Sequence, residues 1–195
     1  MGSIRHAAAI LATLVLTLSA AAAGAQDLSR SLVLVAKPEL GQFYRGSVLL
    51  VRPLGAGAHV GVIVNRPTPV TVAKLFPERR KAQHLTKPVF LGGPVHADTL
   101  FALVERPESP GGQSISFGNN LYLAIDVPVI DGMIEQNAND VRFIVGLVVW
   151  RPGELELELG KGIWLLPDTD ARLLIQKPAE GLWEELVATA RRVLI

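Results

Sequence analysis

Short runs of apolar residues, separated by glycines and prolines, make up most of this chain. The run over residues 60–64 is apolar apart from Gly61 and consists of β-branched valine and isoleucine, which favours a strand over a helix. Successive residues of a strand point to opposite faces, and here both sets are apolar. This pattern is typical of a strand in the middle of a sheet, covered on both faces. Asn65, Arg66 and Pro67 follow it. Because proline has no N–H to donate, the sequence predicts that the strand ladder ends at Pro67.

Similar runs predict further strands on both sides of this one. The glycines at residues 55–57 form a turn before it, which indicates a hairpin with the preceding strand. Gly118, Asn119 and Asn120 supply a second turn between two short apolar runs. The expected strands are residues 31–36, 47–51, 60–64, 88–92, 99–105, 114–117, 121–125, 141–150, 163–166 and 172–175.

Three segments carry helical signals. Thr68 or Thr71 is suited to cap a short helix at residues 72–76, and Asp126 is suited to cap a second one. The third segment, residues 178–192, is amphipathic, with glutamates early and arginines late, as the helix dipole favours.

Residues 152–159 carry conflicting signals. Glutamate and leucine alternate from Glu154 to Leu159, which is typical of a half-exposed strand, whereas Pro152 followed by glutamates is typical of a helix start. With either assignment the chain has many strands, often connected by hairpins, and a few helices. The pattern therefore predicts a single α+β domain around a largely antiparallel or mixed sheet.

The first 25 residues have the three parts of a secretory signal peptide. Arg5 precedes an apolar run over residues 7–23, and an Ala-Gly-Ala sequence ending at Ala25 provides small residues for cleavage. We therefore expect residues 26–195 to form the mature domain, in the periplasm or secreted. One alternative is an uncleaved helix anchored in the inner membrane, although the run is near the lower length limit for a span. The other is a cytoplasmic protein with a mis-annotated start.

The composition excludes several classes of function. The chain has no cysteine, so it contains no disulfide, thiolate nucleophile, thiolate metal site or lipidated cysteine. One of the 19 basic side chains, Arg5, leaves with the leader, which leaves 18 basic and 18 acidic side chains. A neutral chain has no general attraction for a phosphate backbone, so we expect no nucleic-acid partner. After cleavage we also expect no stable membrane span.

The polar end of the 60–64 strand is the first candidate site. Asn65 and Arg66 are able to hydrogen-bond an anionic ligand, the arginine as a fork, or else Asn65 caps a turn and Arg66 is solvated or ion-paired. Gly92 and Gly93 either let the backbone approach a ligand or form a tight turn. A large aromatic residue, Trp150, is either core or a pocket wall. The residues expected to share one ligand pocket are Asn65, Arg66, Gly92, Gly93, Pro94 and Trp150.

Histidines offer a second candidate. His96 and Asp98 lie on one side of an extended segment, and with His59 and His84 they have the residue types of a metal site. The alternative is that they are ordinary turn and surface residues, and no His-x-x-x-His or paired-carboxylate motif supports zinc. We therefore expect no metal, no cofactor and no catalytic residue. A metal-dependent hydrolase using His96 and Asp98 is kept as an alternative.

Seven short motifs occur in a fixed order along the mature chain. They are Val35-Ala-Lys-Pro38, Phe43-Tyr-Arg-Gly-Ser-Val48, Gly61-Val-Ile-Val-Asn-Arg-Pro67, Gly92-Gly-Pro-Val95, Trp150-Arg-Pro-Gly-Glu-Leu-Glu156, Trp164-Leu165 and Leu182-Trp183. Taken together, this ordered set resembles the YqgE/AlgH family of uncharacterised bacterial proteins.

The resemblance implies a compact single α+β domain with a central, partly barrel-like sheet and peripheral helices. It also implies that residues 152–159 are helical. It implies no established activity, although a transcriptional role has been inferred for the family from a link to alginate production. Family members generally lack a signal peptide and are expected in the cytoplasm, so the leader is a departure here. Two smaller departures are His59, before Gly61, and Glu154 in place of the usual glutamine.

Our leading hypothesis is a non-enzymatic domain of the bacterial envelope that binds an unidentified small ligand or protein partner. The alternatives are a cytoplasmic regulator-like protein with a mis-annotated start and the hydrolase described above.

Overall fold

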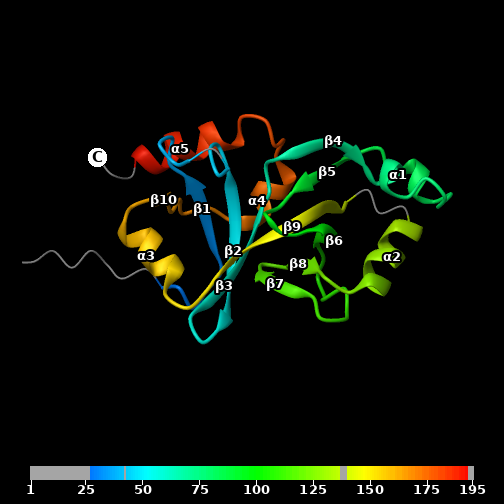
Figure 1. Cartoon of the computed structure of the whole chain (residues 1–195), viewed down its shortest axis with the longest axis horizontal. Helices are drawn as coiled ribbons and strands as arrows, with labels where there is room; N and C mark the ends of the chain where they lie inside the picture. The colour runs from blue at the N-terminus through cyan, green and yellow to red at the C-terminus, as the bar shows by residue number, and fades with distance from the viewer. Residues whose placement is uncertain (1–26, 42, 137–139, 193–195) are drawn as a thin grey trace, which may run out of the picture.

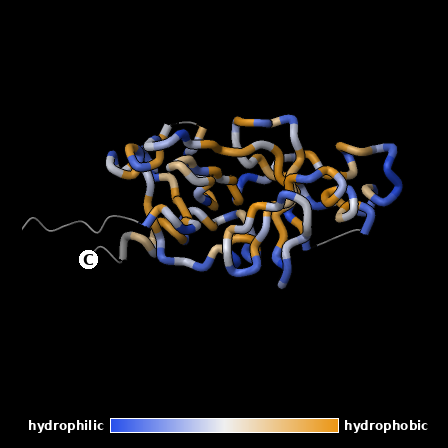
Figure 2. The backbone as a smooth tube through the Cα atoms, turned by 90° about the horizontal axis from the view of Figure 1, so that it is seen from below, coloured by the Kyte–Doolittle hydropathy of each residue, from blue (hydrophilic) through white to orange (hydrophobic). Residues whose placement is uncertain are grey.

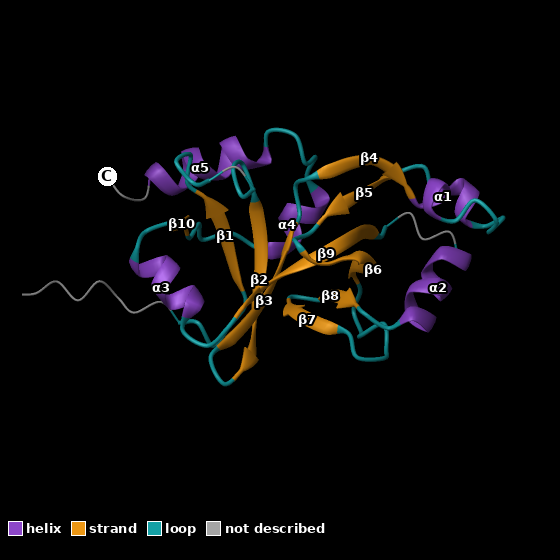
Figure 3. Ribbon diagram, viewed as in Figure 1, coloured by secondary structure: helices purple, strands orange, loops and turns teal. Residues whose placement is uncertain are grey.

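The computed structural model describes residues 27–41, 43–136 and 140–192; the predicted signal peptide lies outside them. Within these ranges the chain forms a strand-rich α+β fold with helices at the periphery (Figure 1, Figure 3). The strands are β1 (Leu32–Ala36), β2 (Val48–Gly55), β3 (Ala58–Ile63), β4 (Pro67–Thr71), β5 (Pro88–Leu91), β6 (Val95–Glu105), β7 (Ile115–Gly118), β8 (Leu121–Ala124), β9 (Arg142–Trp150) and β10 (Trp164–Leu165). The helices are α1 (Val72–Leu75), the 3₁₀ helix η1 (Ala82–His84), α2 (Val127–Glu135), α3 (Glu154–Gly160), α4 (Ala171–Gln176) and α5 (Leu182–Arg192).

The described strands form one open sheet. Their order is β10-β1-β2-β3-β9-β6-β8-β7, with β5 beside β9 and β4 beside β5. Every pairing is antiparallel except that of β5 with β9. The end strands β10 and β7 do not pair, so the partly barrel-like closure implied by the family resemblance is wrong. Helices α4 and α5 pack in one buried cluster with residues of β1 and β8.

Strand β3 has the central position that its sequence predicts. It lies between β2 and β9, and its valines Val60 and Val62 are buried on the face that α4 and α5 cover. Ile63 is buried on the opposite face, against the cluster beneath α3. Burying a valine or isoleucine stabilises a fold by roughly 1.5–3 kcal/mol, so both faces of this strand contribute to the core.

Three buried clusters fill the molecule along its long axis. The first joins α4 and α5 to one face of the sheet, the second joins α1 and α2 to β6 and β9, and the third lies beneath α3. Figure 2 shows the same arrangement from below, with hydrophobic stretches along the strands and hydrophilic residues at the outer turns. No helix of the described ranges is long and apolar enough to cross a membrane.

Strand β4 begins at Pro67, where the sequence predicts the end of a ladder. Pro67 is exposed and lies opposite Phe90 of β5. Within the described chain β4 has β5 as its single neighbour. Because proline is tolerated where its nitrogen faces no partner strand, it is compatible with this edge position. The ladder of β3 ends at Ile63, before Pro67, as the sequence predicts, but the local pattern did not predict the new strand that Pro67 begins.

Two further segments differ from their local patterns. Residues 172–175, expected as a strand, lie in α4, where the Asp170 side chain caps the helix by accepting from the Arg172 N–H at 2.9 Å. Four apolar-rich residues are too few for periodicity to separate helix from strand. The alternating segment at 154–159 is helix α3, as the family resemblance implied; Gly153, with φ of 83°, precedes it.

Candidate functional site

The polar residues after β3 bind neighbouring parts of the chain. Asn65 accepts a hydrogen bond from the Val48 N–H through Oδ1 and donates one from Nδ2 to the Gly46 carbonyl, each at 2.8 Å. Nη2 of Arg66 donates to the Ser47 hydroxyl oxygen at 2.6 Å, and partial burial lowers the pKa of Arg66. Both side chains therefore have structural contacts that fix the start of β2.

The Gly92–Pro94 turn lies beside this segment. The Leu91 N–H donates to the Arg66 carbonyl at 2.9 Å, so the two predicted parts of the site are neighbours. A β-carbon at Gly92 would lie 2.4 Å from a backbone oxygen of β9, and one at Gly93 would lie 2.1 Å from the β9 backbone. These distances are shorter than any side chain tolerates, so glycine is required where the two backbones cross.

Trp150 is turned toward α3. It is 3% exposed, and its indole N–H donates to Oε2 of Glu158 at 2.9 Å. The indole N–H of Trp164 donates to the same oxygen at 2.7 Å. Trp150 therefore packs with the cluster beneath α3, whereas Asn65 and Arg66 contact the start of β2.

The histidines differ in their solvent exposure. His96 and Asp98 are exposed on β6, and His96 has a φ of 53°. His59 is 2% exposed; its Nε2 lies 3.2 Å from the Leu28 carbonyl oxygen, and its Nδ1 has no hydrogen-bond partner among the described residues. Across residues 27–41, 43–136 and 140–192, no three His, Asp or Glu side chains are grouped to hold a metal ion.

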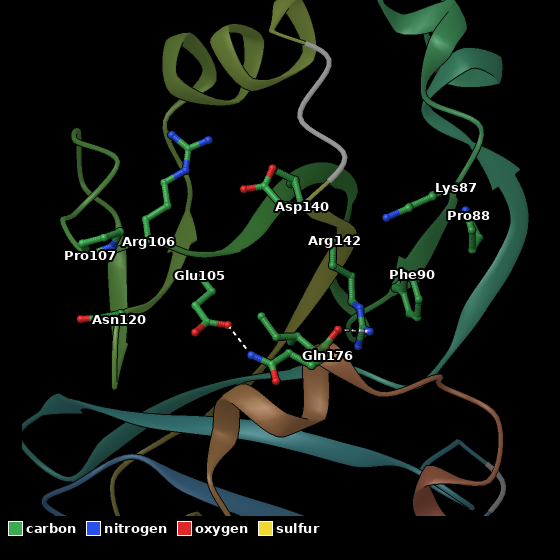
Figure 4. A pocket seen from close by; sticks show the side chains of 12 residues that line it. Lys87, Pro88, Phe90, Glu105, Arg106, Pro107, Asn120, Asp140, Arg142 and Gln176 are labelled. Atoms are coloured by element: carbon green, nitrogen blue, oxygen red, sulfur yellow. Dashed lines mark hydrogen bonds between the residues drawn. The ribbon is translucent and has the colours of Figure 1, made fainter.

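A cavity of about 580 Å³ opens between β5, β6, β9 and α4 (Figure 4). Its size falls within the range of roughly 300–1,000 Å³ that is typical of small-molecule sites. We call it the Arg142 cavity, after the charged residue at its wall. Its lining residues are Lys87, Pro88, Phe90, Glu105, Arg106, Pro107, Asn120, Asp140, Val141, Arg142, Ile175 and Gln176.

Arg142 joins three elements at this wall. Nη1 donates to the Val64 carbonyl at 2.6 Å and to the Leu174 carbonyl at 3.3 Å, and Nη2 donates to the Ile175 carbonyl at 3.0 Å. The guanidinium also lies 4.6 Å from the centroid of the Phe90 ring. The last carbonyls of a helix have no partner within it, so Arg142 satisfies the end of α4 and complements its dipole.

Arg142 is a partly buried cation without an acidic partner among the described residues. Burial lowers its pKa to about 10, because the charged form loses hydration. The carbonyl oxygens and the aromatic face compensate this loss in part. A positive charge that no carboxylate neutralises therefore lies beside the cavity.

The remaining charges of the cavity are arranged around this wall. Glu105 accepts a hydrogen bond from Nε2 of Gln176 at 2.9 Å. Arg106 and Asp140 lie on one side, with the Asp140 carboxylate directed toward the Arg106 side chain, and Lys87 points in from the other side (Figure 4). Neither Arg106 nor Asp140 has a side-chain hydrogen bond or ion pair within the described chain.

Local sequence patterns do not predict this cavity. None of the six predicted site residues lines it, although Phe90 does, and Phe90 lies opposite Pro67 in the β4–β5 pair. The available signal was Arg142 itself, a charged residue at the start of a long apolar strand. A partly buried arginine without a carboxylate partner is uncommon, so such a position indicates a structural or functional role.

The fold and the cavity together define a class: a single α+β domain with an open sheet, a few helices and a ligand-sized cavity at the side of that sheet. The sequence model of the AlgH-like family matches residues 33–192, and the chain therefore belongs to this family. The family membership expected from the motifs is confirmed.

Relatives and solved structures agree with this assignment. A UPF0301 protein of Cytophaga hutchinsonii is 28% identical over 165 residues, which cover 82% of this chain and 88% of the relative. A UPF0301 protein of Xylella fastidiosa is 32% identical over 159 residues, covering 78% and 84%. The solution structure of the AlgH protein from Pseudomonas aeruginosa has a TM-score of 0.67 at 24% identity and covers 86% of this chain and 89% of its own. A crystal structure from Corynebacterium diphtheriae has a TM-score of 0.63 at 19% identity, covering 80% and 84%. At these identities the two structures show a shared fold.

Proposed function

We propose that this protein is a non-enzymatic binding domain, exported to the bacterial envelope, that holds a small polar ligand in the Arg142 cavity. The observation that carries the proposal is Arg142, a partly buried cation fixed by backbone carbonyls beside a ligand-sized space and without an acidic partner in the described chain.

Arg142 acts on a ligand mainly through its charge. Both of its Nη atoms already donate to carbonyl oxygens, so the guanidinium cannot rotate toward a ligand without breaking these bonds. A negative group about 5 Å from such a charge gains roughly 3 kcal/mol at an effective dielectric constant of about 20. A fixed charge of this kind costs little further ordering on binding.

The residues predicted as the site enter the proposal as the support behind the cavity. Asn65 and Arg66 directly follow Val64, whose carbonyl accepts from Arg142. The Gly92–Pro94 turn follows β5, which carries Phe90 against the guanidinium and bonds the Arg66 carbonyl through the Leu91 N–H. Trp150 enters through β9, the strand that carries Arg142 at its other end. In this proposal the family motifs position the cavity wall.

Binding is tested by titrating the purified protein with inorganic phosphate, acetate, citrate, amino acids and dipeptides, and by following backbone amide NMR signals. At least one compound is expected to shift the amides of β5, β6 and α4 around the cavity. Gln176→Trp, which places a large side chain at the cavity, is expected to weaken this binding at least tenfold. Gln113→Trp adds the same side chain on an exposed loop and is the control. If no compound shifts the cavity amides, the proposal fails.

Export is tested with the full chain, including its leader, in a bacterium that has an outer membrane. The expected result is protein in the periplasm or the medium that begins at Gln26 by N-terminal sequencing. Protein in the membrane fraction with its leader intact indicates an anchor instead. Recovery in the cytoplasm contradicts export and favours a cytoplasmic regulator.

A further inference from the structure

We propose that the ligand of the Arg142 cavity is a zwitterion, namely an amino acid or short peptide with free termini. Arg106 binds its carboxylate and Asp140 binds its ammonium group. The inference rests on the proposed function, since it names the ligand class of the same cavity.

Arg106 and Asp140 carry opposite charges but do not pair with each other. Both line the cavity, and Figure 4 shows the Asp140 carboxylate directed toward the Arg106 side chain. They nevertheless form no ion pair with each other, and neither side chain bonds any other described residue. Opposite charges that face one cavity and stay unpaired are the groups that a ligand carrying both charges bridges.

The lining of the cavity contains charges of both signs. Three cationic side chains and two carboxylates face the same space, the carboxylates being Glu105 and Asp140. A purely anionic ligand therefore meets two like charges, and a purely cationic ligand meets three. A ligand with both charges avoids both repulsions, and such repulsions are a source of specificity.

Part of the cavity lining is apolar. Phe90 and Pro88 contribute apolar surface on the side away from Arg106 (Figure 4), so one ligand can place its charged termini on one side and a hydrocarbon side chain on the other. Ile175 adds further apolar lining. The amide groups of Asn120 and Gln176 add hydrogen-bonding groups of the kind that a peptide bond uses. A volume of about 580 Å³ accommodates an amino acid or a dipeptide.

The test uses alanyl-leucine and its two singly capped forms, N-acetyl-alanyl-leucine and alanyl-leucine amide, in calorimetric titrations of the purified full-length protein. We expect the dipeptide to bind at least tenfold more tightly than either capped form, because each cap removes one charge. Arg106→Gln is expected to abolish the preference for the dipeptide over its amide. Asp140→Asn is expected to abolish the preference over the acetylated form. Arg80→Gln, which removes an exposed cation outside the cavity lining, is the control and should keep both preferences.

The outcomes separate the two proposals. Equal binding of the dipeptide and its capped forms, or preferences that survive both variants, overturns the zwitterion assignment. If phosphate or citrate shifts the cavity amides while the dipeptide does not, the zwitterion assignment fails and the binding function stands. If no probe shifts these amides, both fail.

Discussion

An arginine and two glycines join β9 to its neighbours: Arg142, which lines the cavity, and Gly92 and Gly93, which do not. Arg142 gathers carbonyl groups from the end of β3 and the end of α4, which lie far apart in the sequence. Gly92 and Gly93 let β5 continue against β9 at distances that no β-carbon allows. The packing around β9 therefore depends on charge at one residue and on the absence of a side chain at two others.

Gly93→Ala is expected to destabilise the protein by more than about 3 kcal/mol, because its β-carbon would lie 2.1 Å from the β9 backbone. Gly132→Ala is the matched control. Gly132 lies within α2, with no atom within 4 Å of the added carbon, so it should raise stability by up to about 1 kcal/mol. Urea unfolding measures both. A Gly93→Ala protein as stable as the wild type would contradict the close crossing.

The local sequence marked Gly92 and Gly93 as special positions but did not reveal the close contact with β9 that requires glycine there. Gly92 and Gly93 read locally as a turn before proline, and the crossing strand lies more than 50 residues further along the chain. Asn65 follows the end of β3, as the sequence predicts, but its two hydrogen bonds go to Gly46 and Val48 at the start of β2. Local sequence does not specify such long-range partners.

Helix α4 carries the cavity's lower wall and depends on a capped start. The Asp170 side chain accepts from the Arg172 N–H, and its hydrogen bonds with the Arg172 side chain and backbone lower the pKa of Asp170 to about 2. The carboxylate is therefore more acidic in the folded state than its ordinary value of 3.8. A lowered pKa stabilises the fold above the ordinary value, and this contribution is lost as the pH falls toward 2.

Asp170→Asn is expected to lower stability at pH 7 by up to about 1 kcal/mol, because asparagine still caps the helix but lacks the charge. The difference from the wild type should shrink between pH 4 and pH 2, where Asp170 becomes protonated. Urea unfolding at several pH values measures it. Asp168→Asn, two residues earlier, is the control, and a difference that stays constant with pH would rule out this role for Asp170.

Elements with a complete local signal were predicted well, and elements defined by a neighbour were not. The hairpin of β2 and β3 and the amphipathic helix α5 follow from turn residues and periodicity. Strand β4 and helix α4 do not, because one exists only through pairing with β5 and the other is too short for a periodic pattern.

Strand β9 connects the whole molecule. Its residues belong to all three buried clusters: Phe143 packs with α1 and α2, Leu147 with α4 and α5, and Trp150 beneath α3. Because the clusters share this strand, losing one removes packing from the others. Single domains of this size usually unfold in one transition when their cores are connected in this way.

We therefore expect a single unfolding transition seen by two probes. The tryptophans Trp150, Trp164 and Trp183 lie in the clusters around α3 and α5, so their fluorescence reports one half of the molecule. Met133 lies in the cluster with α1 and α2, so its methyl NMR signal reports the other half. The two urea midpoints should coincide. Midpoints that differ clearly would mean that the halves unfold separately.

The sequence by itself determined the family, the buried central strand at residues 60–64 and the predominance of strands over helices. These follow from local patterns, namely alternation, β-branching, turn residues and ordered motifs. Only the tertiary structure decided the strand order, the open ends of the sheet and the cavity. The cavity joins residues from β5, β6, β9 and α4, and these meet only through pairings between strands distant in the chain. Local propensity does not carry the partner of a strand, which is set by how all the buried faces pack together.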